Sequence, residues 1–181
     1  MDIPMVTEKL KAEHQFILRW ISWMEGLAMT DAQTGADASN SQLLKHVENV
    51  VGFISDYADA YHHSKEEDVL FRYLAHPGVL TECNPLPVML SEHAAARTIL
   101  RQMQYAASLA DVGGLIEQVR LYAGLLKQHI FKEDNILYQM AEQGLTMSMK
   151  QQILAEYSAI DGDRQNIELE RHYRTLLNSM D

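Results

Sequence analysis

The stretch HHSKEEDVLF at residues 62–71 returns as HIFKEDNILY at residues 129–138. Each copy opens with histidine and carries lysine and glutamate at the same places. An acid, a β-branched residue, leucine and an aromatic residue then follow in the same order. Shorter matches precede the two copies, at Glu13-His14 and at Glu92-His93. The chain therefore predicts two helical hairpins of one design, each offering a single histidine and then a His-x-x-x-Glu pair.

The intervals between three breaks have the periodicity of helices. The breaks are residues 30–40, rich in small polar residues, residues 76–85, which end in Asn84-Pro85, and the turn at residues 111–114. Between them, apolar residues recur every three or four positions and predict helices over residues 5–29, 41–75, 85–110 and 115–142. We expect an all-α fold: an antiparallel up-down-up-down four-helix bundle with an additional C-terminal helical segment.

The chain after Gly144, which we expect to end the fourth helix as a C-cap, has a thinner apolar stripe and more charge. We therefore expect residues 1–144 to form the bundle and residues 145–181 to form a helical extension, interrupted near residues 161–163. The extension would pack on the bundle or on a partner chain, which allows a homo-oligomer.

Composition supports one helical domain and excludes several partners. The chain has 181 residues, 47 % of them hydrophobic, with nine glycines and four prolines. A net charge of −10 argues against nucleic acid, because phosphate binding needs clustered lysine and arginine. The single cysteine, Cys83, allows no internal disulfide, and no apolar run is long enough for a membrane span or a signal peptide. We expect a cytoplasmic protein without membrane contact.

The spacing of the repeat brings six side chains to one level. Residues four apart share a helix face with Cβ atoms roughly 6 Å apart, which fits His62 with Glu66 and His129 with Glu133. In antiparallel hairpins, the depth of His14 in the bundle matches that of His62, and the depth of His93 matches that of His129, each to within about two turns. The candidate metal ligands are His14, His62, Glu66, His93, His129 and Glu133.

A metal explains why glutamates would enter an apolar bundle. Two buried carboxylates without compensation would each cost several kcal/mol or take up protons. Cations offset that charge, and a carboxylate can bridge two of them. Imidazole and carboxylate without thiolate favour iron or manganese over a structural zinc site.

This pattern resembles the hemerythrin-like (HHE cation-binding) family over residues 5–142. The resemblance implies a non-haem di-iron centre with two Fe ions, in which Glu66 and Glu133 bridge and the four histidines are terminal ligands. Members of that family bind dioxygen reversibly, respond to oxygen, nitric oxide or iron, or help repair damaged iron sites. We therefore expect a protein that binds or senses a small ligand, such as dioxygen, nitric oxide or peroxide, or that handles iron.

One departure from the family bears on function. The oxygen-carrying members have five histidines, two of them one turn apart on the third helix, whereas Met89 and Arg97 flank His93 here. Water, Glu67 or Tyr122 are candidates for the vacant position. The departure favours sensing, peroxide or nitric oxide chemistry, or iron handling over oxygen storage.

Two other classes of function remain open. A ferritin-like di-iron oxidase would need Glu-x-x-His pairs, and the chain offers only Glu170-x-His172. A regulatory or interaction module would use the metal site structurally and bind a partner through the residues after 144.

The other histidines and the repeated lysines have simpler interpretations. His63 follows His62 on the same helix and is rotated by about 100°, so we expect it on the helix surface or behind the ligands. We expect solvated side chains at His46, His76, His172, Lys65 and Lys132.

Overall fold

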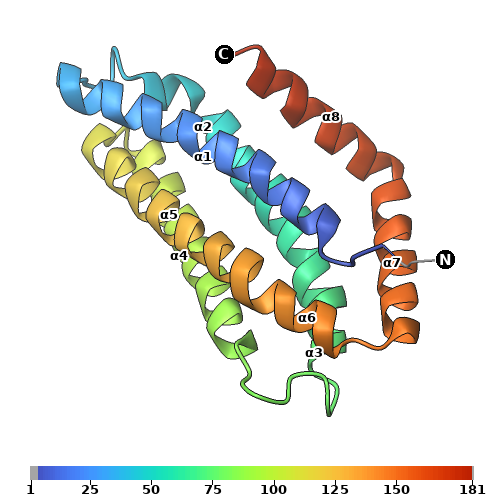
Figure 1. Ribbon diagram of the computed structural model, residues 1–181. Coiled ribbons are helices and arrows are strands. Elements are labelled where there is room, and N and C mark those ends of the chain that lie inside the picture. Colours follow the sequence, from blue (N-terminus) through green and yellow to red (C-terminus); the bar gives the residue numbers. More distant parts are fainter. Residues whose placement is uncertain (1–3, 181) are drawn as a thin grey trace.

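The computed structural model describes residues 4–180, which form six continuous helical segments and no strand (Figure 1). Three of its elements are π-helices, labelled η, in which hydrogen bonds join residues five apart rather than four. The elements are α1 (Glu8–Thr34), α2 (Gln42–Gly52), η1 (Phe53–His63), η2 (Glu66–Leu70), α3 (Phe71–Leu74), α4 (Leu86–Ser108), α5 (Val112–Lys132), η3 (Glu133–Leu137), α6 (Tyr138–Gly144), α7 (Met147–Gly162) and α8 (Arg164–Asn178).

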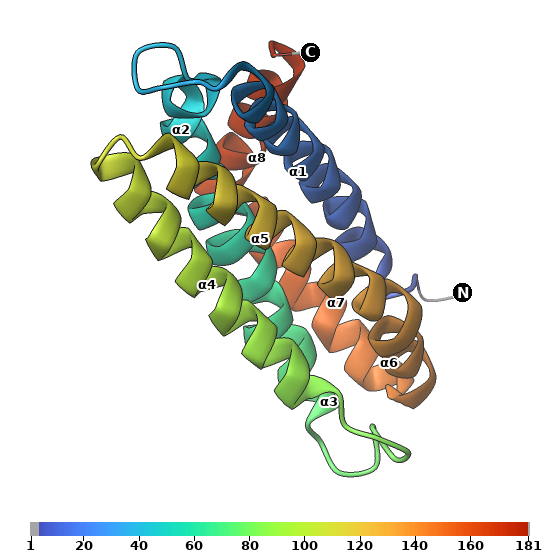
Figure 2. The ribbon, with the colours of Figure 1, turned by 90° about the vertical axis from the view of Figure 1, so that its left-hand side faces the viewer.

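Four of the six segments form the predicted bundle. The second segment runs from α2 through η1 and η2 to α3, and the fourth runs from α5 through η3 to α6. Neighbours in sequence are antiparallel: α1 packs on α2 and α5, and α4 packs on α5 and η1 (Figures 1 and 2). The all-α, up-down-up-down prediction is therefore confirmed.

The first helix is longer than its sequence suggested. It continues to Thr34 and ends where Gly35 adopts a left-handed conformation with φ of 62°. The buried carboxylate of Asp31, in the last turn of α1, accepts hydrogen bonds from Ser41 and from the backbone of Gln42 and Leu43. The predicted break began too early: residues 30–34 continue the helix, the loop covers residues 35–41, and Asp31 caps the start of α2 from within α1.

The prediction of a turn over residues 111–114 was also wrong. Asp111 is the N-cap of α5, and its side chain accepts a hydrogen bond from the backbone of Gly114, which already lies in the helix. At the start of α4, the N-cap is Pro85, and the side chain of the preceding Asn84 accepts a hydrogen bond from the backbone of Leu86.

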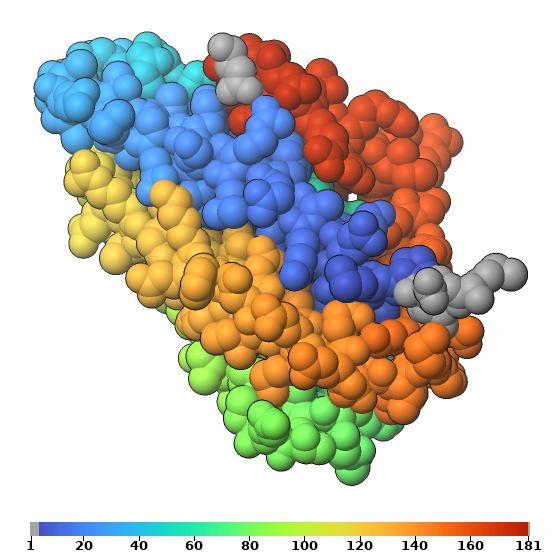
Figure 3. All heavy atoms as spheres, in the orientation of Figure 1, coloured from blue at the N-terminus to red at the C-terminus, as the bar shows by residue number. Residues whose placement is uncertain are grey.

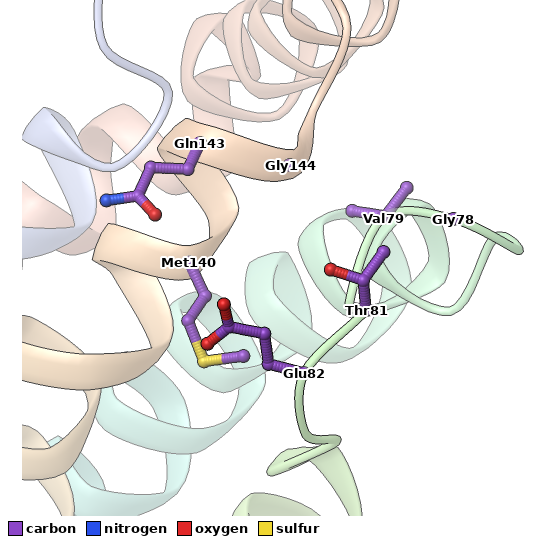
Figure 4. A pocket seen from close by; sticks show the side chains of 7 residues that line it. All are labelled: Gly78, Val79, Thr81, Glu82, Met140, Gln143 and Gly144. Carbon is purple, nitrogen blue, oxygen red and sulfur yellow. The ribbon is translucent and has the colours of Figure 1, made fainter.

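Gly144 closes the fourth segment for a different reason than the one expected. It has no positive φ; a Cβ atom there would lie 2.3 Å from the carbonyl oxygen of Val79. The loop that carries Val79 crosses α6 at this point and forms a surface pocket with Gly78, Thr81, Glu82, Met140 and Gln143 (Figure 4). The close contact between the loop and the helix requires glycine.

We expect Gly144→Ala to destabilise the protein by about 1–3 kcal/mol, because the new methyl group overlaps a backbone atom. Gly124→Ala in α5 is the matched control, since a Cβ atom there meets nothing within 4 Å. It should stabilise by up to about 1 kcal/mol through helix propensity. Chemical denaturation measures both, and equal effects of the two substitutions would contradict the overlap.

A polar layer divides the core of the bundle into two apolar regions. One region surrounds Trp20, Phe53 and Tyr57, and the other surrounds Leu10, Leu70 and Leu137. His14 lies between Leu10 and the larger region. In each segment of the bundle, the buried side chains on one side of this layer belong to one apolar region and those on the other side belong to the second.

The C-terminal helices α7 and α8 pack on the bundle of their own chain. They lie beside η1 and η2, and the surface of α8 adjoins that of α1 (Figure 3). Tyr173 of α8 packs edge-on against Trp20 and Phe53 and donates a hydrogen bond to Asp56. Among the described residues, no helix is long and apolar enough to cross a membrane.

Candidate metal centre

The structure brings all six predicted ligands into the polar layer, and each residue is at most 1 % exposed. The two π-helical turns η2 and η3 begin at Glu66 and Glu133, immediately after the two histidine-bearing stretches. α1 supplies His14 and α4 supplies His93, so the four segments of the bundle all contribute.

The imidazole Nε2 atoms converge on the two carboxylates. Glu66 lies 3.4 Å from His93, 3.8 Å from His62 and 4.0 Å from His14. Glu133 lies 3.1 Å from His129, 3.3 Å from His14 and 4.0 Å from His93. Each glutamate therefore approaches histidines from both hairpins, as a bridging carboxylate must.

The other ring nitrogen, Nδ1, of each of these histidines donates a hydrogen bond to a carboxylate outside the layer. The four bonds are His14 to Asp134 at 2.8 Å, His62 to Glu13 at 2.8 Å, His93 to Glu67 at 2.7 Å, and His129 to Glu92 at 2.9 Å. A neutral imidazole that donates from Nδ1 presents a lone pair at Nε2. Such carboxylate–imidazole pairs fix the ring orientation of metal ligands.

Sequence analysis named Glu67 as a candidate ligand, and it did not assign this role to Glu13, Glu92 or Asp134. The repeat contains the missing information: an acid precedes each single histidine, and an acid follows each glutamate of the His-x-x-x-Glu pairs. Glu13 and Glu92 contact histidines of the following helix in their own hairpin. Glu67 and Asp134 contact the single histidine of the other hairpin.

The glutamates strongly attract positive charge. Burial favours the neutral form of His14, but the hydrogen bond to Asp134 and the nearby charges of Glu133 and Glu66 raise its pKa to about 10. Burial is likewise outweighed at His129, where Glu133 raises the pKa to about 9. Burial also opposes the charge of Glu66, yet the surrounding histidines hold its pKa well below the usual value.

The donor set fits cations and little else. Within residues 4–180, Glu66 Oε2 and both carboxylate oxygens of Glu133 are buried without a hydrogen-bond partner. The Nε2 atoms of His93 and His129 lie only 2.9 Å apart, so two lone pairs would face each other if both rings are neutral. Orphaned carboxylate oxygens and converging lone pairs are what a metal ion satisfies.

His63 belongs to this layer as well, contrary to expectation. Its side chain is 2 % exposed, and its ring stacks on that of His93 with centroids 3.9 Å apart. His63 does point away from His62, which meets Glu13 of α1, but the side of the helix that it occupies is covered by α4 and not by solvent. Burial lowers the pKa of His63 to about 3, so its ring is neutral.

Tyr138 is a second group that sequence analysis did not single out. Its hydroxyl donates a hydrogen bond to Glu66 and lies 3.4 Å from His14 Nε2, and its ring stacks on His14. Tyr138 lies one π-helical turn after Glu133, on the same face of the helix. The backbone N–H of Tyr138 donates a hydrogen bond to the carbonyl oxygen of Glu133. Tyr122 instead lines a small cavity beside His63 and Asp59.

The two repeated lysines differ in their surroundings. Lys65 is 1 % exposed and donates to Glu13 and to Asp161 of α7, so the prediction of a solvated side chain was wrong. Lys132 donates to Glu92 and is 33 % exposed. His76 and His172 are exposed and His46 is partly so. Glu170, which the sequence offered as part of a ferritin-type pair, lies outside the layer and pairs with Arg174 on α8.

A helical bundle whose four segments converge on a buried imidazole–carboxylate layer defines a cation-binding bundle protein. The family model "Hemerythrin HHE cation binding domain" matches residues 5–141, well over half of the chain. The chain therefore belongs to the hemerythrin HHE cation-binding family. Comparison with curated proteins and with solved structures finds no match.

Proposed function

We propose that the protein holds two iron ions in this layer and binds or senses a small ligand, such as dioxygen, nitric oxide or peroxide, or handles iron. The observation that carries the proposal is the pocket of unpartnered acceptors: three orphaned carboxylate oxygens facing four imidazole Nε2 atoms. His14, His62, His93 and His129 would be terminal ligands, and Glu66 and Glu133 would bridge.

Burial limits what can reach the layer. All six residues are at most 1 % exposed, so a bulky organic substrate has no approach, whereas a diatomic molecule or peroxide is small enough. A small cavity lined by Ile54, Ala96, Leu100 and Tyr122 lies next to His63. Iron bound in the polar layer would supply a coordination position for the small ligand and could change its oxidation state.

The chain's own groups have defined tasks in this proposal. The outer carboxylates orient the imidazoles, and the Tyr138 hydroxyl, whose pKa burial and the neighbouring carboxylates raise well above its usual value, stays protonated and donates. The apolar regions on both sides of the layer exclude water, which strengthens the electrostatic attraction for cations.

We expect protein reconstituted with Fe(II) to hold close to two irons per chain and to develop ligand-to-iron charge-transfer absorption on oxidation. Metal analysis and optical spectra of the reduced protein with dioxygen, nitric oxide and peroxide in turn measure this and identify the ligand. A single zinc ion, or no metal after iron-supplemented expression, would contradict the proposal. Steady turnover of added Fe(II) or of an organic substrate would instead favour an oxidase.

A further inference from the structure

We propose that His63 is a fifth imidazole ligand, which makes the two metal positions unequal: three imidazoles serve one position and two serve the other. The inference rests on the proposed di-iron function and deepens it. Its starting point is that His63 lies inside the polar layer rather than on the surface of its helix.

The first argument is proximity. One ligand atom each from His63, Glu66, His93 and His129 lie within 4.8 Å of one another, which is close enough to surround one ion. His63 stacks on His93 with an interplanar angle of 15° and meets the edge of the His129 ring at 5.8 Å. No contact within the described residues gives the inward nitrogen of His63 a hydrogen bond.

The second argument is orientation. The Nδ1 atom of His63 lies 3.3 Å from Asp59, which accepts from it, and Asp59 is held in turn by Arg97 at 2.8 Å. This is the arrangement that the other four histidines of the layer have with their outer carboxylates. It directs the Nε2 lone pair of His63 inward, as a ligand requires.

The third argument comes from the repeat. A separate group of ligand atoms, from His14, His62 and Glu66, defines the other position. Where the first copy of the repeat has His63, the second has Ile130, so the second position receives no additional imidazole. Tyr138, whose counterpart in the first copy is Phe71, places a hydroxyl beside that position instead. The two copies of the repeat therefore differ at two places, His63 against Ile130 and Phe71 against Tyr138, and these differences make the two metal positions unequal.

The test compares three variants of the full chain loaded with Fe(II) and then challenged with a chelator. His63→Phe keeps a ring to stack on His93 but cannot ligate, and His63→Ala leaves space for free imidazole. Ile130→Ala is the matched control, because it removes a buried side chain at the equivalent place of the other copy. Circular dichroism verifies that each variant is folded.

We expect the wild type and Ile130→Ala to retain two irons and both His63 variants to retain about one. Loss of a carboxylate that only hydrogen-bonds a ligand weakens metal binding roughly 10–100-fold, and loss of a ligand should weaken it at least as much. Added imidazole should restore the second iron in His63→Ala and not change the control.

Retention of two irons by His63→Phe, or failure of imidazole to restore iron in folded His63→Ala, would overturn the assignment and leave His63 a packing role. Such a result would leave the di-iron proposal intact, because the wild type would still hold two irons. If the wild type itself holds no iron pair, the proposed function fails first, so the two failures are distinguishable.

Discussion

Glu66→Gln should abolish binding of both irons, with an affinity loss of more than about 100-fold at each position. Removing a group that only hydrogen-bonds a metal ligand already weakens metal affinity roughly 10–100-fold. Glu66 is the one carboxylate that both groups of converging ligand atoms share. The amide that replaces it has nearly the same size but carries no charge and offers one oxygen, so it cannot offset or bridge two cations. Iron analysis after reconstitution measures the loss.

The fold should survive this substitution. The substitution removes a buried charge and leaves an amide oxygen that can still accept the hydrogen bond from Tyr138. The far-ultraviolet circular dichroism of Glu66→Gln should therefore match that of the metal-free wild type.

Glu67→Gln is the matched control for this prediction. The neighbouring side chain is 23 % exposed and accepts from His93 Nδ1 and from Arg97, outside the layer. Its loss should weaken one position by roughly 10–100-fold and spare the other. If Glu66→Gln retains two irons, or if the two variants behave alike, Glu66 does not bridge.

The six inward-facing residues could be predicted because the information is local and repeated. The i, i+4 spacing of His62 and Glu66 is a property of one helix turn, and the second copy of the motif at residues 129–138 makes a coincidence improbable. The levels of His14 and His93 followed from helix lengths, which needed accuracy only to about a turn. Their meeting in one buried layer tolerated errors of several residues in the predicted helix ends.

His63 could not be placed because periodicity does not reveal which neighbouring helices cover a given side of a helix. A residue about 100° from His62 points away from the ligand line of its own helix, but a second helix can still bury it. Here His62 meets Glu13 of α1 and His63 stacks on His93 of α4, so adjacent histidines are both buried. π-helical turns are frequent at functional sites, so two adjacent histidines before a His-x-x-x-Glu pair could have prompted the question.

Lys65 shows a different limit. Its local sequence is that of Lys132, so any prediction from the repeat treats them alike. What separates them is α7, which covers only the first copy and brings Asp161 to Lys65 and Tyr61. Burial of a charged side chain therefore depended on a segment about a hundred residues away in sequence, whose position periodicity cannot give.

Lys65→Met should destabilise the protein by about 3–5 kcal/mol, the cost of removing one partner from a buried ion pair. Glu13, which is itself buried beside His62, would lose its cation, whereas Asp161 would keep its ion pair with Lys9. For a chain of this size such a loss corresponds to a fall in melting temperature of roughly 10 °C. Thermal unfolding of the iron-loaded protein measures it.

Lys132→Met supplies the comparison, because the same substitution in the second copy of the repeat removes a lysine that is 33 % exposed and pairs with the partly exposed Glu92. Partly exposed ion pairs contribute at most about 1 kcal/mol, so this variant should unfold close to the wild type. The difference between the variants isolates the effect of burial under α7, since residue type, motif position and substitution are identical. Equal, small effects would mean that Asp161 and α7 do not enclose Lys65 in solution, and that the C-terminal helices pack less closely on the bundle than the structure shows.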